Sequence, residues 1–270
     1  MPADLHVHTT ASDGTVTPAG VVQLARALGL GAIAITDHDT VSGVAPALQR
    51  AGATDGPLVI PGIEISASHQ GRDVHILGYY VDTKHAGFLA RIKELAEKRA
   101  ERAARMIARL QSLGLAVTLN DVLDFAGPAS LGRPHIADAL LRAGIVKNRA
   151  EAFSRWIGRD CPGYVSRQQV SPFEAVALVR LAKGVPVLAH PGTARVDDII
   201  ADLAVVGLQG LEVYHPDHTP EQVRRYLDLA AALRLVATGG SDFHGSDNHG
   251  RLGEALVPLK VVEELKLRRM

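Results

Sequence analysis

The sequence predicts an α/β fold whose parallel strands form either a barrel or an open sheet, interrupted by a helical insertion. Short apolar runs rich in β-branched residues, such as 31–36 and 186–189, alternate with amphipathic segments of helical period. Polar residues follow these runs at their carboxyl ends, where such folds carry their ligand sites. Residues 84–170 lack the strand alternation. We therefore expect a barrel domain of residues 1–83 and 171–270, with 84–170 as an insertion that caps the site.

The composition fits one large domain with an insertion. The chain has 270 residues, 47% of them hydrophobic, and its 29 Lys plus Arg balance 29 Asp plus Glu. Because the net charge is zero, we do not expect a long-range positive field that would attract duplex nucleic acid. Cys161 is the single cysteine, which excludes an internal disulfide and a Cys-rich zinc site and suits a reducing cytoplasm. We expect no signal peptide, no membrane span and no membrane partner. The sequence does not predict an oligomeric state.

The elements can be assigned in chain order. Thr17 and Pro18 have the character of a helix N-cap and first turn, and Gly29 ends that helix. The other predicted helices cover residues 41–51, 88–113, 120–125, 134–143, 150–156, 171–181 and 196–204, with two more beginning near 219 and 259. The first predicted strand begins at Asp4 and runs into a polar loop that reaches Gly14. The other predicted strands cover residues 31–36, 58–66, 73–79, 186–189, 208–213 and 235–238, with a short extended piece at 255–259.

The opening strand carries the first candidate metal ligands. His6 and His8 point to one face because side chains alternate along a strand, so both imidazoles can hold one ion. Asp13 follows in a Ser-Asp-Gly turn that can return its carboxylate toward the same place. Two core histidines and a turn aspartate are the alternative for this motif taken alone.

The later strands extend the pattern, because nearly every one ends in a histidine or a carboxylate. In chain order these residues are Asp37, His38, Glu64, His75, His190, Glu212, His215, Asp242 and His244. Mixed imidazole and carboxylate ligands suit zinc, manganese or iron rather than calcium or copper(I). The sequence therefore predicts a multinuclear metal site, in which a glutamate can bridge two ions.

These motifs resemble those of the PHP (polymerase and histidinol phosphatase) superfamily. The matching segments are His6-x-His8, Thr36-Asp37-His38-Asp39, Gly62-Ile63-Glu64, His75, His190-Pro191 and Ser241-Asp242-x-His244. The resemblance covers roughly residues 1–83 and 171–250, and it implies a distorted, TIM-like (β/α)7 barrel with three divalent ions. Manganese is the expected metal, with zinc or iron as alternatives.

The resemblance also implies the ligand sets. His6, His8, Glu64 and Asp242 would hold one ion. Glu64 would bridge to a second ion held by His75 and His190, and Asp13, His38 and His244 would hold a third. Glu64, His38 and Asp242 are the residues expected to be essential for catalysis, with metal-activated hydroxide attacking phosphorus.

The Ser12-Asp13-Gly14 version of the motif resembles one branch of the superfamily, which includes nucleoside 3′,5′-bisphosphate phosphatases and short-oligonucleotide 5′-nucleases. It implies a small nucleotide as substrate, with removal of the 3′-phosphate from nucleoside 3′,5′-bisphosphates. Trimming of short single-stranded RNA or DNA is a further implied activity. Histidinol phosphate phosphatase is the enzymatic alternative, and a non-catalytic metal-binding module is the alternative from another class.

The insertion is expected to contact the substrate. Arg133 and His135 lie at the start of a predicted helix, where anions are favoured and arginine binds phosphate in a two-pronged manner. Stabilisation of the helix start is the alternative. Arg99 and Arg102 on the long helix are candidates for a second phosphate, against the alternative of a solvated basic face. His215 is a candidate for the pocket wall or for the layer behind the ligands.

Overall fold

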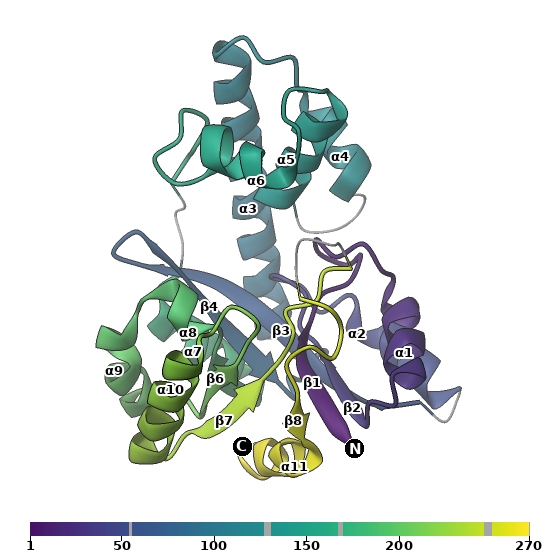
Figure 1. Cartoon of the computed structure of the whole chain (residues 1–270), viewed down its shortest axis with the longest axis vertical. Coiled ribbons are helices and arrows are strands. Elements are labelled where there is room, and N and C mark those ends of the chain that lie inside the picture. The colour runs from purple at the N-terminus through teal and green to yellow at the C-terminus, as the bar shows by residue number, and fades with distance from the viewer. Residues whose placement is uncertain (54–55, 127–130, 167–169, 246–249, 270) are drawn as a thin grey trace. The chain divides into compact units, whose positions relative to one another are not determined.

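The structure is a computed structural model, and it describes residues 1–53, 56–126, 131–166, 170–245 and 250–269. Contacts within the chain divide it into two units. The barrel unit comprises Met1–Ile92 and Gln169–Met270, and the helical unit comprises Lys93–Gln168. Figure 1 labels the elements of both units.

The barrel unit is built on one mixed sheet with the described strand order β7-β6-β5-β4-β3-β2-β1-β8. Its strands are β1 (Pro2–Val7), β2 (Ala32–Ile35), β3 (Leu58–His69), β4 (Arg72–Tyr79), β5 (Val185–Leu188), β6 (Gly210–Tyr214), β7 (Val236–Gly239) and β8 (Val257–Pro258). The segment after β7 returns to β1, where His8 N–H donates to the Phe243 carbonyl at 2.9 Å. The sheet is therefore a nearly closed, distorted barrel, which confirms the predicted fold class.

Two of the described strands depart from a parallel arrangement, since β8 pairs antiparallel with β1 and β4 runs against the predicted parallel pattern. β4 pairs antiparallel with both β3 and β5, because β3 and β4 form a hairpin in which His69 and Arg72 are opposite each other. Both residues of the intervening turn, Gln70 and Gly71, have positive φ, as a two-residue type I′ turn requires. The prediction that His75 lies at a strand exit is therefore wrong. His75 lies in the first half of β4, which the reversal brings to the edge where β3 places Glu64.

Helices cover the outer side of this sheet, with α7 against β3 to β5 and α10 against β6 and β7 (Figure 1). The barrel unit contains α1 (Pro18–Ala27), α2 (Val44–Gly52), α7 (Pro172–Leu181), α8 (Pro191–Ala194), α9 (Ile200–Val205), α10 (Pro220–Leu233) and α11 (Leu259–Leu267). The predicted cap at Thr17 is present, since its side chain accepts the Gly20 N–H at 3.1 Å. The helix predicted over 196–204 is instead a 3₁₀ turn (Asp197–Ile199) followed by α9.

Two apolar layers hold the barrel unit together. Along β2, Ala32 and Ala34 belong to one buried cluster with Leu77 and Val187. The alternating side chains of Ile33 and Ile35 belong to a second cluster, with Val21, Val22 and Val44 from α1 and α2. The sheet is thus buried on both faces. This explains why its strands read as continuous apolar runs rather than as an alternating pattern.

The helical unit has its own core. The long helix α3 (Ala86–Ser112) begins in the barrel unit and continues into the helical unit, followed by α4 (Leu119–Ala126), α5 (Arg133–Arg142), α6 (Arg149–Ala152) and a π-helical turn (Phe153–Ile157). Their buried side chains form one cluster, which includes Met106, Leu110, Ile136, Leu140 and Ile157. These helices lie where the sequence predicted them. Within the described residues, the helices lack any stretch that is both long and apolar enough to cross a bilayer.

The end of α1 gives a test of backbone conformation. Gly29 has φ +70°, while a Cβ added at either Gly29 or Gly52 would meet no other heavy atom within 4 Å. We expect Gly29→Ala to lower the free energy of unfolding by about 1 kcal/mol, because an L side chain is strained at this φ. Gly52→Ala is the matched control and is expected to leave stability unchanged or slightly higher. Denaturant titration of both variants measures this, and equal stabilities would contradict the assignment.

Candidate metal centre

Four side chains from separate parts of the barrel unit converge on one point. The donor atoms are His6 Nε2, His8 Nε2, Glu64 Oε2 and Asp242 Oδ1. The two carboxylate oxygens lie 3.1–3.4 Å from the two imidazole nitrogens. A tetrahedral ion with bonds of about 2.0–2.1 Å holds its ligand atoms about 3.3–3.4 Å apart. The set therefore fits a single divalent ion.

The second oxygen of Glu64 faces two further histidines. Glu64 Oε1 lies 2.8 Å from His75 Nδ1 and 3.3 Å from His190 Nε2. His38 Nδ1 is also 3.0 Å from Glu64 Oε2. The carboxylate thus has imidazole groups on both oxygens, as a bridge between two ions requires.

A third group lies beside the first. His8, Asp13, His38 and His244 offer donor atoms that all lie within 4.8 Å of one another. The Asp13 carboxylate is 3.4 Å from His244 Nε2 and 3.8 Å from His38 Nε2. All nine residues predicted as metal ligands are therefore gathered in one cluster of the barrel unit.

The cluster concentrates opposite charges under burial. Burial would raise the pKa of Glu64, but His38, His75 and His6 outweigh it and hold that pKa well below its usual range. Burial would lower the pKa of His8, whereas hydrogen bonds to Asp242 and Glu64 raise it to about 10. The carboxylates are thus ionised, and some imidazoles hold protons that a divalent cation would displace.

Glu212 on β6 orients two of the predicted ligands. Its side chain is fully buried, with Oε1 3.0 Å from His6 Nδ1, while Oε2 accepts the His190 N–H at 2.7 Å. A carboxylate on the far ring nitrogen fixes the imidazole so that Nε2 presents its lone pair to a metal. From the sequence, Glu212 was predicted only as a carboxylate at the end of a strand. The signal for its role was a charged residue inside an otherwise apolar run.

Two more buried aspartates fix the loops that carry ligands. Asp37 accepts the Thr9 N–H at 2.8 Å and the Ser12 hydroxyl at 2.7 Å, which holds the turn that presents Asp13. Asp4 accepts the N–H and the hydroxyl of Ser241 at 2.9 and 2.6 Å, directly before Asp242. No role was predicted for Asp4 from the sequence, although a carboxylate within a buried strand is itself a signal of a partner.

The side chain of His215 lies at the candidate metal centre. Its Nε2 is 3.7 Å from Asp242 Oδ2, and its ring centroid is 5.4 Å from that of His190. The side chain is almost fully buried. Its assignment to substrate binding stays a prediction.

The other predicted substrate-binding residues belong to the helical unit. Arg99 Nε donates to the Leu131 carbonyl at 2.8 Å, and His135 Nδ1 accepts the Gly132 N–H at 3.0 Å. These contacts gather Arg99 and His135 around the start of α5, where Arg133 is the first helical residue. Arg102 Nε donates to the Val165 carbonyl at 2.8 Å. Their substrate contacts also stay predictions.

Comparisons with known proteins agree with this geometry. A family model for the PHP domain matches residues 4–114. The chain is 34% identical to a 3′,5′-nucleoside bisphosphate phosphatase of Chromobacterium violaceum over 254 residues, covering 92% of this chain and 89% of that protein. It is 32% identical to the 5′-3′ exoribonuclease Rnm of Escherichia coli over 247 residues, covering 89% of this chain and 84% of that protein.

A solved structure shows the same likeness along the whole chain. A protein from Bifidobacterium adolescentis, assigned as a metal-dependent phosphoesterase, superposes with a TM-score of 0.92 at 36% identity, covering 99% of this chain and 96% of its own. The similarity in sequence and the similarity in structure thus extend beyond the motifs to almost every element. We conclude that this chain belongs to the PHP domain family and is a metal-dependent phosphoesterase.

Proposed function

We propose that this enzyme removes the 3′-phosphate from nucleoside 3′,5′-bisphosphates, with 5′-to-3′ trimming of short single-stranded RNA or DNA as a second activity. The observation that carries the proposal is the likeness to the bisphosphate phosphatase, which spans 92% of this chain and so includes the helical unit. The likeness to an exoribonuclease supports the second activity. The comparisons do not favour histidinol phosphate phosphatase, and relatives named as hydrolases disfavour a non-catalytic module.

The proposal includes three divalent ions, with manganese as the expected metal and zinc or iron as alternatives. The convergent donor atoms support the three ligand sets inferred from the sequence, with Glu64 shared between two of them. When bound, such ions lower the pKa of water and neutralise phosphoryl oxygens. We also propose that the enzyme acts in the cytoplasm, because a chain whose only cysteine is Cys161 suits a reducing compartment.

The chain's own residues then have separate roles in holding the metal centre and in binding the substrate. Glu64, His38 and Asp242 hold the centre in which the cleaved phosphate lies, and His215 borders it beside Asp242. Arg133 and His135 bind a phosphate of the substrate, and Arg99 and Arg102 bind a second phosphate. The start of α5 supports this, because helix N–H groups and guanidinium forks both favour phosphate oxygens.

A substrate panel tests the proposed function. Manganese-loaded enzyme is given adenosine 3′,5′-bisphosphate, a short 5′-phosphorylated oligoribonucleotide and histidinol phosphate, and phosphate or nucleotide release is measured. We expect the highest kcat/KM for the bisphosphate, with a product that retains the 5′-phosphate. A preference for histidinol phosphate, or release of the 5′-phosphate, would contradict the proposal.

Glu64→Gln tests the bridging carboxylate. We expect loss of bound metal and a fall in activity of more than about 100-fold. The fall should be this large because changing a residue that only hydrogen-bonds to a metal ligand already costs about 10- to 100-fold. Elemental analysis and kinetics on the same sample measure both quantities. Glu263→Gln, at an exposed position of α11, is the control that keeps wild-type metal content. Full metal content with full activity in Glu64→Gln would reject the bridge.

Glu212→Gln tests the carboxylate behind His6 and His190. We expect metal affinity to fall about 10- to 100-fold, because the imidazole of His6 loses its charged partner. Competition with a chelating dye measures the affinity, and the melting temperature of metal-free protein reports any general loss of stability. Asp228→Asn, on the exposed side of α10, is the matched control. Wild-type affinity in Glu212→Gln would show that Glu212 does not position the ligands.

A further inference from the structure

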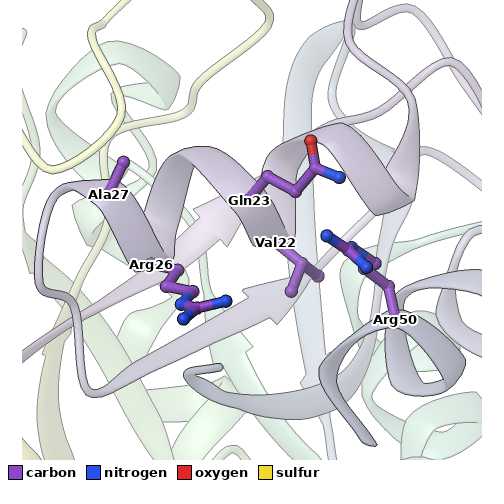
Figure 2. A pocket seen from close by; sticks show the side chains of 5 residues that line it. All are labelled: Val22, Gln23, Arg26, Ala27 and Arg50. Atoms are coloured by element: carbon purple, nitrogen blue, oxygen red, sulfur yellow. The ribbon is translucent and has the colours of Figure 1, made fainter. Parts of the chain in front are cut away.

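A pocket separate from the metal centre lies on the barrel unit, between α1 and α2. Its volume is about 300 Å³, and it is lined by Val22, Gln23, Arg26, Ala27 and Arg50. Figure 2 shows Arg26 extending from α1 and Arg50 facing it from α2, with Val22 between them. None of these residues belongs to the metal centre, so the inference does not rest on the proposed function.

The charged residues that line this pocket are both positive. Residues 14–36, which include α1, contain one charged residue, Arg26, and residues 40–53, which include α2, contain one, Arg50. Charged residues make up 21% of the whole chain, yet here both charges are arginines and both line the same pocket. The lining residues therefore carry two positive charges and no negative charge.

The pocket wall also holds one of the guanidinium groups in place. With its amide oriented so that the oxygen faces α2, Gln23 accepts hydrogen bonds from Arg50 Nη2 at 2.9 Å and from Arg50 Nε at 3.2 Å. This orientation gives Arg50 a defined position on the pocket wall before any ligand arrives. Less side-chain entropy is then lost when Arg50 engages a ligand.

The apolar floor of the pocket strengthens charge–charge contacts made inside it. Val22 is 1% exposed and belongs to the apolar cluster under α1, and Ala27 adds a second apolar surface. An apolar floor limits solvent on one side, so a charge–charge contact there is stronger than on an open surface. A volume of about 300 Å³ is at the small end of ligand pockets, which suits a compact anion.

We propose that this pocket binds a phosphate group, either free phosphate or the phosphate of a mononucleotide. Guanidinium groups bind phosphate oxygens through paired hydrogen bonds, and two of them from different helices can engage one phosphate from two sides. Arg26 and Arg50 provide the charge, while Gln23 positions Arg50. The site is a second anion site on the barrel unit, formed by residues that take no part in the metal centre.

Residue-resolved NMR separates this site from the metal centre. Zinc-loaded, ²H,¹⁵N-labelled protein is titrated with inorganic phosphate, with AMP and, as an ionic-strength control, with KCl. We expect saturable shifts of the amide signals of α1 and α2, in addition to shifts near His6 and Asp242. Shifts with phosphate alone assign the free anion as the ligand, shifts with AMP alone assign the nucleotide, and shifts with both assign the shared phosphate group. Each of these results supports the site.

Variants complete the test. We expect the double substitution Arg26→Ala with Arg50→Ala to weaken binding at α1 and α2 at least ten-fold, while the shifts near the metal centre and the turnover stay as in wild type. Arg224→Ala, at an exposed position of α10, is the matched control and keeps both sets of shifts. Absence of saturable shifts in α1 and α2, shifts equal to those with KCl, or shifts that survive the double substitution would each overturn the proposal.

Discussion

The structure depends on the buried carboxylate of Glu64. Its two oxygens lie within 3.4 Å of nitrogen atoms from His6, His8, His38, His75 and His190. An ionised carboxylate is costly to bury unless positive charge and hydrogen-bond donors compensate it. The strands and loops that carry these histidines therefore come together around β3, and the same concentration of donor atoms makes the centre attractive to divalent cations.

A second layer of carboxylates keeps this arrangement in place. Glu212, Asp37 and Asp4 are all buried, and each accepts hydrogen bonds from a ligand residue or from the segment that carries one. Each therefore ties distant parts of the chain together, as Asp4 on β1 does with Ser241. His190, with φ 25° and ψ 60°, is held in an unfavourable backbone conformation beside Glu212, which accepts its N–H. Geometry at the centre is thus determined by hydrogen bonds behind the ligands as well as by the ligands.

The sequence predicted those features that depend on neighbouring residues. Thr17 identified a helix start and Gly29 its end, and the apolar run at 31–36 identified β2, because each signal is local. The nine predicted ligand residues could be named because their types recur near the ends of the predicted strands and match a known order of motifs, although Glu64 and His75 lie within β3 and β4. The reversal of β4 was missed, since Gln70-Gly71 is a weaker hairpin signal than Asn-Gly or Asp-Gly. Pairing of Glu212 with His6 joins residues 206 positions apart, and nothing local in the sequence reports such a contact.

The division into two units also separates two kinds of chemistry. Metal-dependent hydrolysis of a phosphate ester needs a compact cationic centre, and the barrel unit contains all nine residues predicted as metal ligands. Discrimination between a mononucleotide and an oligonucleotide needs contacts to the remainder of the substrate, and the predicted residues for these lie around α5 in the helical unit. Proteins named as a bisphosphate phosphatase and as an exoribonuclease have similar identity to this chain, 34% and 32%. If the predicted substrate contacts around α5 are correct, we expect substrate preference to depend on residues of the helical unit such as Arg99 and Arg133, which can be changed without altering Glu64.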